Sequence, residues 1–176
     1  MKGHCILSHG FESGPDATKV TALAQAAECL GWTHERPDYT DLDAKREISD
    51  LGDVPARLQR LLQLAQAAAA RGPLVLAGSS LGAWISAQAS LQVPLRGLFL
   101  MAPPVWPGQP HAMQAARVPI SILHGWHDEL IPATQVVDWA AARNARLLLV
   151  DDSHRLGEHV EASAEAFAAL LSGLAA

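Results

Sequence analysis

The chain has 176 residues, of which 49% are apolar and 18% are charged. This length and apolar content suit a single domain with a buried core, and the low charge excludes a disordered protein. The net charge of -5, with no run of Lys or Arg, argues against a nucleic-acid partner.

The sequence contains no apolar run long enough to cross a membrane, which argues against a membrane partner. The apolar start at residues 5–7 turns polar at Ser8, too early for the core of a signal peptide. We therefore expect a cytoplasmic protein. In that compartment, Cys5 and Cys29 are expected to be buried free thiols rather than a disulfide.

Apolar runs and helical patterns follow one another along the chain. In chain order the predicted elements are a strand at 5–8, a helix at 17–30, a strand at 32–36, a helix at 54–71, a strand at 74–77, a helix at 81–91, strands at 95–101 and 118–123, a helix at 134–142, a strand at 146–150 and a helix at 157–174. Asp16 is a candidate N-cap for the first helix. Residues 40–53 are predicted to be a charged loop, and residues 105–117 a loop with room for one helical turn at 111–116.

The predicted strands are continuous apolar runs, as in parallel sheets that are covered by helices on both faces. We therefore predict an α/β fold, a three-layer sandwich of about six mainly parallel strands with helices on both faces. No repeat or linker divides the chain, so residues 1–176 are expected to form one compact domain without a large cap.

The segment GSSLG at 78–82 stands between a predicted strand and a predicted helix. A G-x-S-x-G sequence at such a junction is typical of the nucleophile elbow of serine hydrolases, where the glycines leave room for a sharp turn that exposes the serine. Ser80 is the central residue because Gly78 and Gly82 flank it symmetrically, and Ser79 is expected to pack or cap. The helix that begins here would direct backbone N–H groups at developing negative charge.

Polar residues follow several predicted strands, and the carboxyl ends of parallel strands meet at one edge of a sheet. Ser80 follows the third strand, Asp128 the fifth and His154 the sixth. The order serine, acid, histidine is that of α/β-hydrolases. In such a triad Ser80 would attack a carbonyl carbon, His154 would transfer the proton, and Asp128 would hold the imidazole tautomer.

Two alternative interpretations stay open. Asp151 and Asp152 are rival acids, although they adjoin His154 and would have to fold back onto it. The segment HGWHD at 124–128 could also ligate a metal through two histidines and an aspartate. No further ligand cluster accompanies it, so we predict no metal and no cofactor.

Three segments resemble a known family. HGFESGP at 9–15 with Lys19 is similar to the HGF-x-S-x-P…K segment of the YqiA-like bacterial esterases, HGWHDELIP at 124–132 to their acid segment, and DSHR at 152–155 to their histidine segment. The chain thus resembles the small lid-less serine esterases of the α/β-hydrolase superfamily over nearly its whole length. The resemblance implies an acyl-enzyme and an oxyanion hole made by the backbone N–H groups of Phe11 and Leu81.

The substrate pocket is expected to be lined from the loops at the strand ends. The candidate residues are His9, Gly10, Val105, Trp106, Met113 and Trp126. A structural role suits His9 as well, and covering the edge of the core suits the loop tryptophans as well.

These observations predict a serine hydrolase that cleaves small-molecule carboxylic esters or thioesters of small to medium acyl size. Peptidase and acyltransferase activities use the same triad and are alternatives. From a different class, the chain could be a non-catalytic or protein-interaction member of the fold, of the retinoblastoma-binding serine hydrolase type.

Overall fold

In the computed structural model, which describes residues 2–174, six strands form one sheet in the order β2-β1-β3-β4-β5-β6. The strands are β1 (His4–Ser8), β2 (Thr33–Glu35), β3 (Leu74–Ser79), β4 (Gly97–Met101), β5 (Ile120–Gly125) and β6 (Arg146–Val150). All five neighbouring pairs are parallel. The predicted α/β fold is confirmed, and the sheet is parallel throughout.

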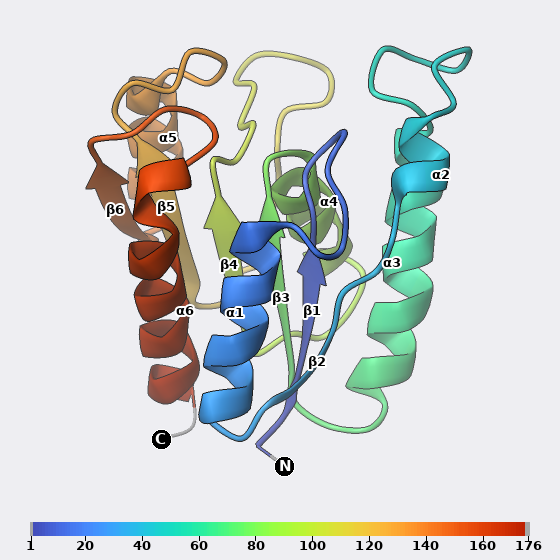
Figure 1. Cartoon of the computed structure of the whole chain (residues 1–176), viewed down its shortest axis with the longest axis vertical. Helices are drawn as coiled ribbons and strands as arrows, with labels where there is room; N and C mark the ends of the chain where they lie inside the picture. The colour runs from blue at the N-terminus through green and yellow to red at the C-terminus, as the bar shows by residue number, and fades with distance from the viewer. Residues whose placement is uncertain (1, 175–176) are drawn as a thin grey trace.

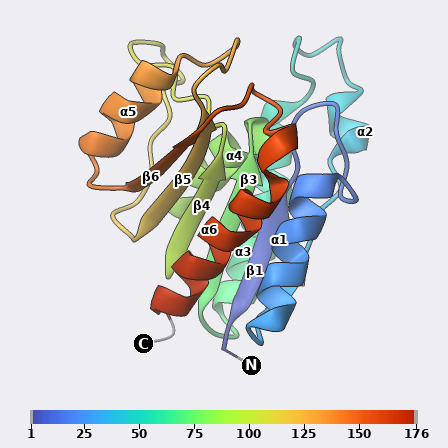
Figure 2. The same cartoon turned by 60° about the vertical axis from the view of Figure 1, so that its left-hand side comes forward.

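Helices cover both faces of this sheet (Figure 1). They are α1 (Thr18–Cys29), α2 (Thr40–Asp43), α3 (Val54–Ala69), α4 (Leu81–Ser90), α5 (Ala133–Ala141) and α6 (Val160–Leu174), which the short 3₁₀ helix η1 (Gly157–His159) precedes. Helices α1 and α6 lie side by side on one face, and α3, α4 and α5 cover the other (Figure 2). No helix within residues 2–174 is long and apolar enough to span a bilayer.

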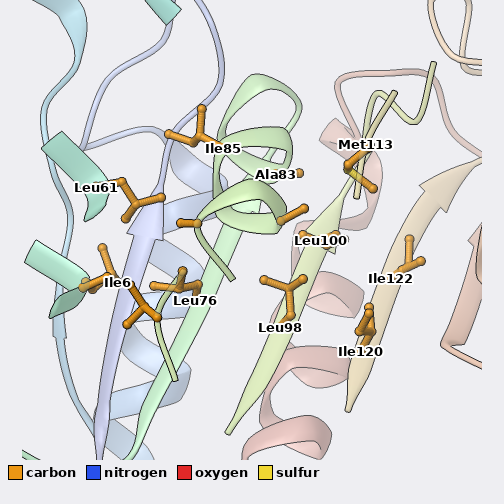
Figure 3. Packing of buried hydrophobic residues seen from close by; sticks show 14 of the residues in the cluster. Ile6, Leu61, Leu76, Ala83, Ile85, Leu98, Leu100, Met113, Ile120 and Ile122 are labelled. Atoms are coloured by element: carbon orange, nitrogen blue, oxygen red, sulfur yellow. The ribbon is translucent and has the colours of Figure 1, made fainter. Parts of the chain in front are cut away.

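The strands contribute alternate side chains to two cores. On the side of α3 and α4, Ile6, Leu76 and Leu98 pack with Leu61 and Ile85 (Figure 3). The intervening strand residues face α1 and α6, and they include Leu7, Val75, Ala77, Phe99 and Leu123. Because both faces are covered, every residue of β3, β4 and β5 is buried, which explains why these strands have continuous apolar sequences.

Two loop predictions need correction. Residues 40–53 contain the single-turn helix α2, whose first N–H, that of Thr40, is accepted by the Asp38 carboxylate. Residues 111–116 form no helical turn, because their backbone groups are bonded elsewhere. The carbonyl of His111 accepts a hydrogen bond from the Trp84 indole, and that of Met113 accepts one from the Trp139 indole.

Two predictions for helix α1 also fail. Its N-cap is Ala17, without a side-chain cap, and the Asp16 carboxylate instead lies 3.5 Å from the Arg36 guanidinium.

Both cysteines are free, as expected, but only Cys5 is buried. Burial raises the pKa of the Cys5 thiol to about 12, which makes it inert, whereas Cys29 lies exposed at the end of α1.

The turn between β3 and α4 is packed backbone against backbone. A Cβ atom on Gly78 would collide with the carbonyl oxygen of Gly82, and one on Gly82 would collide with that of Ser8 in β1. Because the opposing atoms belong to the main chain, no side-chain rotation can relieve either clash. Glycine at position 78 therefore permits the sharp turn from β3 into α4, and glycine at position 82 sets how closely α4 approaches β1.

We expect Gly82→Ala to lower the free energy of unfolding by about 1–3 kcal/mol, because the new methyl group overpacks against β1. Urea unfolding measures the change. Gly14→Ala is the matched control, because an added Cβ there meets no atom within 4 Å. Equal unfolding midpoints for the two variants would contradict the close packing at the turn.

Candidate active site

Ser80 occupies the turn between β3 and α4 with a φ of 52° and a ψ of -117°. Residues other than glycine rarely adopt this conformation, so the surroundings must hold it in place. The N–H of Ser80 donates to the carbonyl of Met101 over 2.9 Å, and the carbonyl of Ser80 accepts from Ala83 and Trp84 in α4. These bonds fix the backbone so that the hydroxyl lies at the carboxyl ends of the strands.

A continuous set of hydrogen bonds joins Ser80, His154 and Asp128. The distance between Ser80 Oγ and His154 Nε2 is 2.9 Å, and that between His154 Nδ1 and Asp128 Oδ2 is 2.7 Å. A carboxylate only accepts, so Nδ1 carries the proton and Nε2 is left to accept the serine proton. The three residues come from turns that are 26 and 48 positions apart in sequence, and the strand ends bring them together.

The Asp128 carboxylate is buried and fully engaged. Its Oδ1 accepts hydrogen bonds from the N–H groups of Leu130 and Ile131, at 2.9 and 2.7 Å. Burial raises the pKa of Asp128, but the hydrogen bonds from His154 and from these two amides outweigh it, so that the pKa lies below its ordinary value. Asp128 is therefore an ionised carboxylate that can stabilise a positive charge on His154.

His124, near the end of β5, lies next to the Asp128 carboxylate. Its Nε2–H donates to the carbonyl of Ile131 over 3.0 Å, and Nε2 lies 3.6 Å from Asp128 Oδ2. Burial lowers the pKa of His124, so this imidazole is neutral. Within residues 2–174 no group of three or more His, Cys, Asp or Glu side chains could hold a metal ion, and His127 instead pairs with Asp151 on the surface.

The two rival acids point away from His154. Asp151 is exposed and lies 2.7 Å from His127 Nε2. Asp152 accepts hydrogen bonds from the N–H groups of Ser153 and Glu158 and lies 2.9 Å from His159 Nδ1. Asp152 therefore organises the loop that carries His154 without touching its ring.

The loop after β1 lies against the elbow. A Cβ on Gly10 would be 3.3 Å from the carbonyl oxygen of Ser79 and 3.7 Å from Ser80 Cβ. Phe11 and Leu81 both line the cavity beside Ser80. No hydrogen bond to the N–H of either residue is formed by another described residue, so both amides are free to bind an oxyanion. His9 is buried, and its ring bonds to backbone groups, which is the structural role.

A cavity of about 790 Å³ opens at Ser80 and His154. Of the six pocket candidates, His9, Gly10 and Trp106 line it. The other three are wrong. Val105 and Met113 are each 1% exposed, and the N–H of Met113 donates to the carbonyl of Val105. Figure 3 shows Met113 among the side chains of the core. Trp126 is 54% exposed and lies outside the cavity, because its N–H bonds to Val150 at the end of β6.

Sequence reasoning missed several charged residues in the cavity wall. The Glu129 carboxylate accepts a hydrogen bond from the backbone N–H of His154, and the Lys19 ammonium donates to the carbonyl of Arg155 over 2.7 Å. Both side chains therefore bond to the backbone of the loop that carries His154. The family resemblance included Lys19, together with residues 9–15. No pattern in the sequence distinguished Glu129 from other surface carboxylates.

A family model described as an alpha/beta hydrolase domain matches residues 1–171. The chain belongs to this family. An alpha/beta hydrolase superfamily protein from Xanthomonas campestris pv. campestris is 69% identical, with a TM-score of 0.95 over 97% of this chain and 99% of that one. No curated protein sequence matches the chain.

More distant α/β hydrolases share the fold. Est1E from Butyrivibrio proteoclasticus is 18% identical with a TM-score of 0.78, and the match covers 98% of this chain and 88% of Est1E. A serine hydrolase without a lid from Xanthomonas campestris is 19% identical with a TM-score of 0.70, over 96% of this chain and 81% of that one. The chain is accordingly a compact α/β hydrolase, and its β4–β5 connection, residues 102–119, contains no helix.

The two buried histidines predict how the stability of this α/β hydrolase depends on pH. Burial lowers the pKa of both His9 and His124, so the unfolded chain takes up protons that the folded chain rejects. Their full contribution is present above the ordinary histidine pKa of about 6.5 and is lost as the pH falls below it. The free energy of unfolding should therefore decrease toward pH 5.

In His124→Asn, one of the two histidines that become protonated on unfolding is absent. Urea unfolding between about pH 7.5 and 5.5 should show a shallower decrease for the variant, by up to about 1.4 kcal/mol per pH unit. An equally steep decrease in the variant would mean that His124 is protonated in the folded protein.

Proposed function

We propose that this α/β hydrolase is a serine hydrolase of carboxylic esters or thioesters with small to medium acyl groups. The observation that carries the proposal is the hydrogen-bonded series from Asp128 through His154 to Ser80, with distances of 2.7 and 2.9 Å. A serine that is merely part of a turn would not need a histidine on its hydroxyl or a buried carboxylate behind that histidine.

The same geometry supplies a mechanism. Ser80 Oγ attacks the carbonyl carbon while His154 Nε2 takes its proton, and the ionised Asp128 stabilises the imidazolium. The N–H groups of Leu81 and Phe11 bind the oxyanion of the tetrahedral intermediate. His154 then protonates the leaving group. A water molecule, activated by the same imidazole, hydrolyses the acyl-enzyme and restores Ser80.

The cavity favours a small-molecule substrate. Its volume of about 790 Å³ lies in the range of small-ligand pockets, and its wall combines apolar residues such as Phe11, Trp106 and Leu130 with a few charged ones. No helical lid covers the entrance from the β4–β5 connection. These features favour esters of short and medium acyl chains over long-chain lipids.

Turnover of p-nitrophenyl esters from acetyl to palmitoyl, with matching acyl-coenzyme A thioesters, tests the substrate class. We expect kcat/KM to be highest for the short and medium chains and to fall for palmitate. A rate that rises up to the longest chain would contradict the size assignment, and hydrolysis of peptides but not of esters would favour the peptidase alternative.

Ser80→Ala should lower ester turnover by about 10⁴–10⁶-fold, because Ser80 carries the hydroxyl that is hydrogen-bonded to His154 Nε2. The adjacent Ser79→Ala is the matched control, since Ser79 is buried at the end of β3. We expect the control to stay within about tenfold of the wild type. Residual activity of Ser80→Ala at the level of this control would rule out Ser80 as the nucleophile.

Asp128→Asn should reduce kcat by about 10⁴-fold, because an amide that donates to His154 would favour the wrong tautomer. Asp151→Asn serves as the control. The Asp151 carboxylate is exposed, and it pairs with the exposed ring of His127 rather than with His154. If Asp151→Asn or Asp152→Asn caused the large loss and Asp128→Asn did not, the acid would be wrongly assigned.

A further inference from the structure

A buried ion pair lies behind the loop that follows β1. Arg57 in α3 is fully buried, and its guanidinium stacks 4.4 Å from the centre of the Tyr39 ring. Asp43, the last residue of α2, is 5% exposed, and its Oδ1 lies 3.4 Å from Arg57 Nε. Two buried charges are expensive to desolvate, so a core that needed only packing would be better served by apolar side chains.

The two partners bond more closely to the loop than to each other. Arg57 Nη2–H donates to the carbonyl of His9 over 2.9 Å, and Asp43 Oδ2 accepts from the N–H of Glu12 over 3.2 Å. By contrast, Arg57 Nε and Asp43 Oδ1 have no hydrogen-bond partner among residues 2–174. Arg57 and Asp43 therefore bond to the first and the last residue of the segment 9–12.

The His9 ring fixes the peptide between these ends. Its Nε2 accepts from the N–H of Tyr39 over 3.0 Å, so Nδ1 carries the proton and donates to the carbonyl of Gly10 over 2.7 Å. Since Nδ1 is a donor, its 3.4 Å approach to Arg57 Nη2 is not a hydrogen bond. In a trans peptide the C=O and N–H point in opposite directions. With the Gly10 carbonyl turned into the core, the Phe11 N–H is turned outward, away from it.

We propose that Arg57 and Asp43 are positioning residues for the oxyanion hole, which hold residues 9–12 so that the Phe11 N–H faces the carbonyl oxygen of the substrate. This inference rests on the proposed hydrolase function. The pair acts through the loop and does not touch the substrate. A misplaced donor would weaken binding of the tetrahedral intermediate more than binding of the ground-state ester.

A second arginine on the same helix provides a matched control. Arg60 binds Asp41 of α2 through two hydrogen bonds of 2.8 and 2.9 Å, at an exposed position. It joins α3 to α2 as Arg57 does and also donates to the carbonyl of Asp38, but no hydrogen bond among the described residues links it directly to residues 9–12. A general loss of contact between these helices should therefore affect Arg60→Met and the Arg57 variants alike.

The test variant is the double substitution Arg57→Met/Asp43→Leu, in which apolar side chains of similar shape replace both charges. Such replacements of a buried pair leave stability nearly unchanged, whereas removing one partner strands the other charge. We expect the double variant to fold, with kcat for a short p-nitrophenyl ester lowered about 10–100-fold and KM within about threefold of the wild type. Inhibition by a trifluoromethyl ketone, which forms an oxyanion on Ser80, should weaken by a similar factor.

Amide hydrogen exchange gives a readout that does not depend on activity. In the double variant the Glu12 amide should exchange faster than in the wild type, while Arg60→Met should leave it unchanged. Unchanged exchange at Glu12, or a kcat within about threefold of Arg60→Met, would overturn the inference. Absence of ester turnover in the wild type would instead overturn the proposed function, and the exchange comparison would still decide whether the pair anchors the loop.

Discussion

The close backbone contact between the β3–α4 turn and the end of β1 is the constraint on which the site depends. Gly82 lies against the carbonyl of Ser8, and Gly10 lies against the carbonyl of Ser79, so the β3–α4 turn and the loop after β1 hold each other in place. Parallel pairing then determines which other strand ends can reach Ser80. Gly125 makes a similar contact with the backbone of Asp152, which brings the acid turn and the histidine loop together. The meeting of Ser80, Asp128 and His154 follows from these main-chain contacts.

Burial decides the charge of each titratable group around Ser80. Asp128 loses water but gains three hydrogen bonds, and it stays ionised. His9 and His124 lose water, and this burial outweighs the carboxylates near them, so the pKa of each is lowered and both rings stay neutral as structural elements. Among these groups only His154 bonds to both a carboxylate and a hydroxyl, which suits it to carry a proton between substrate and serine.

The sequence contained enough information for the fold and for the meeting of Ser80, Asp128 and His154. Continuous apolar runs indicated a sheet covered on both faces, and the order of the three residues at strand ends indicated that their side chains would lie together. The structure places them within hydrogen-bond distance, while their catalytic roles remain a proposal.

The cavity wall could not be predicted in the same way. Val105 and Met113 lie in the core because two tryptophan indoles bond to loop carbonyls, and such contacts between distant elements leave no local pattern in the sequence. Arg57 shows the same limit, since an arginine in an Ala- and Leu-rich helix is expected in solvent, whereas here it is fully buried.

Covalent labelling with a fluorophosphonate, followed by peptide mapping, shows directly whether Ser80 is an activated nucleophile. We expect the folded protein to gain one phosphonyl group on Ser80 and the urea-unfolded protein to gain none, because activation of the hydroxyl requires the assembled set of Ser80, His154 and Asp128. A folded protein that stays unlabelled, or that is labelled on a residue other than Ser80, would show that Ser80 is not the activated nucleophile.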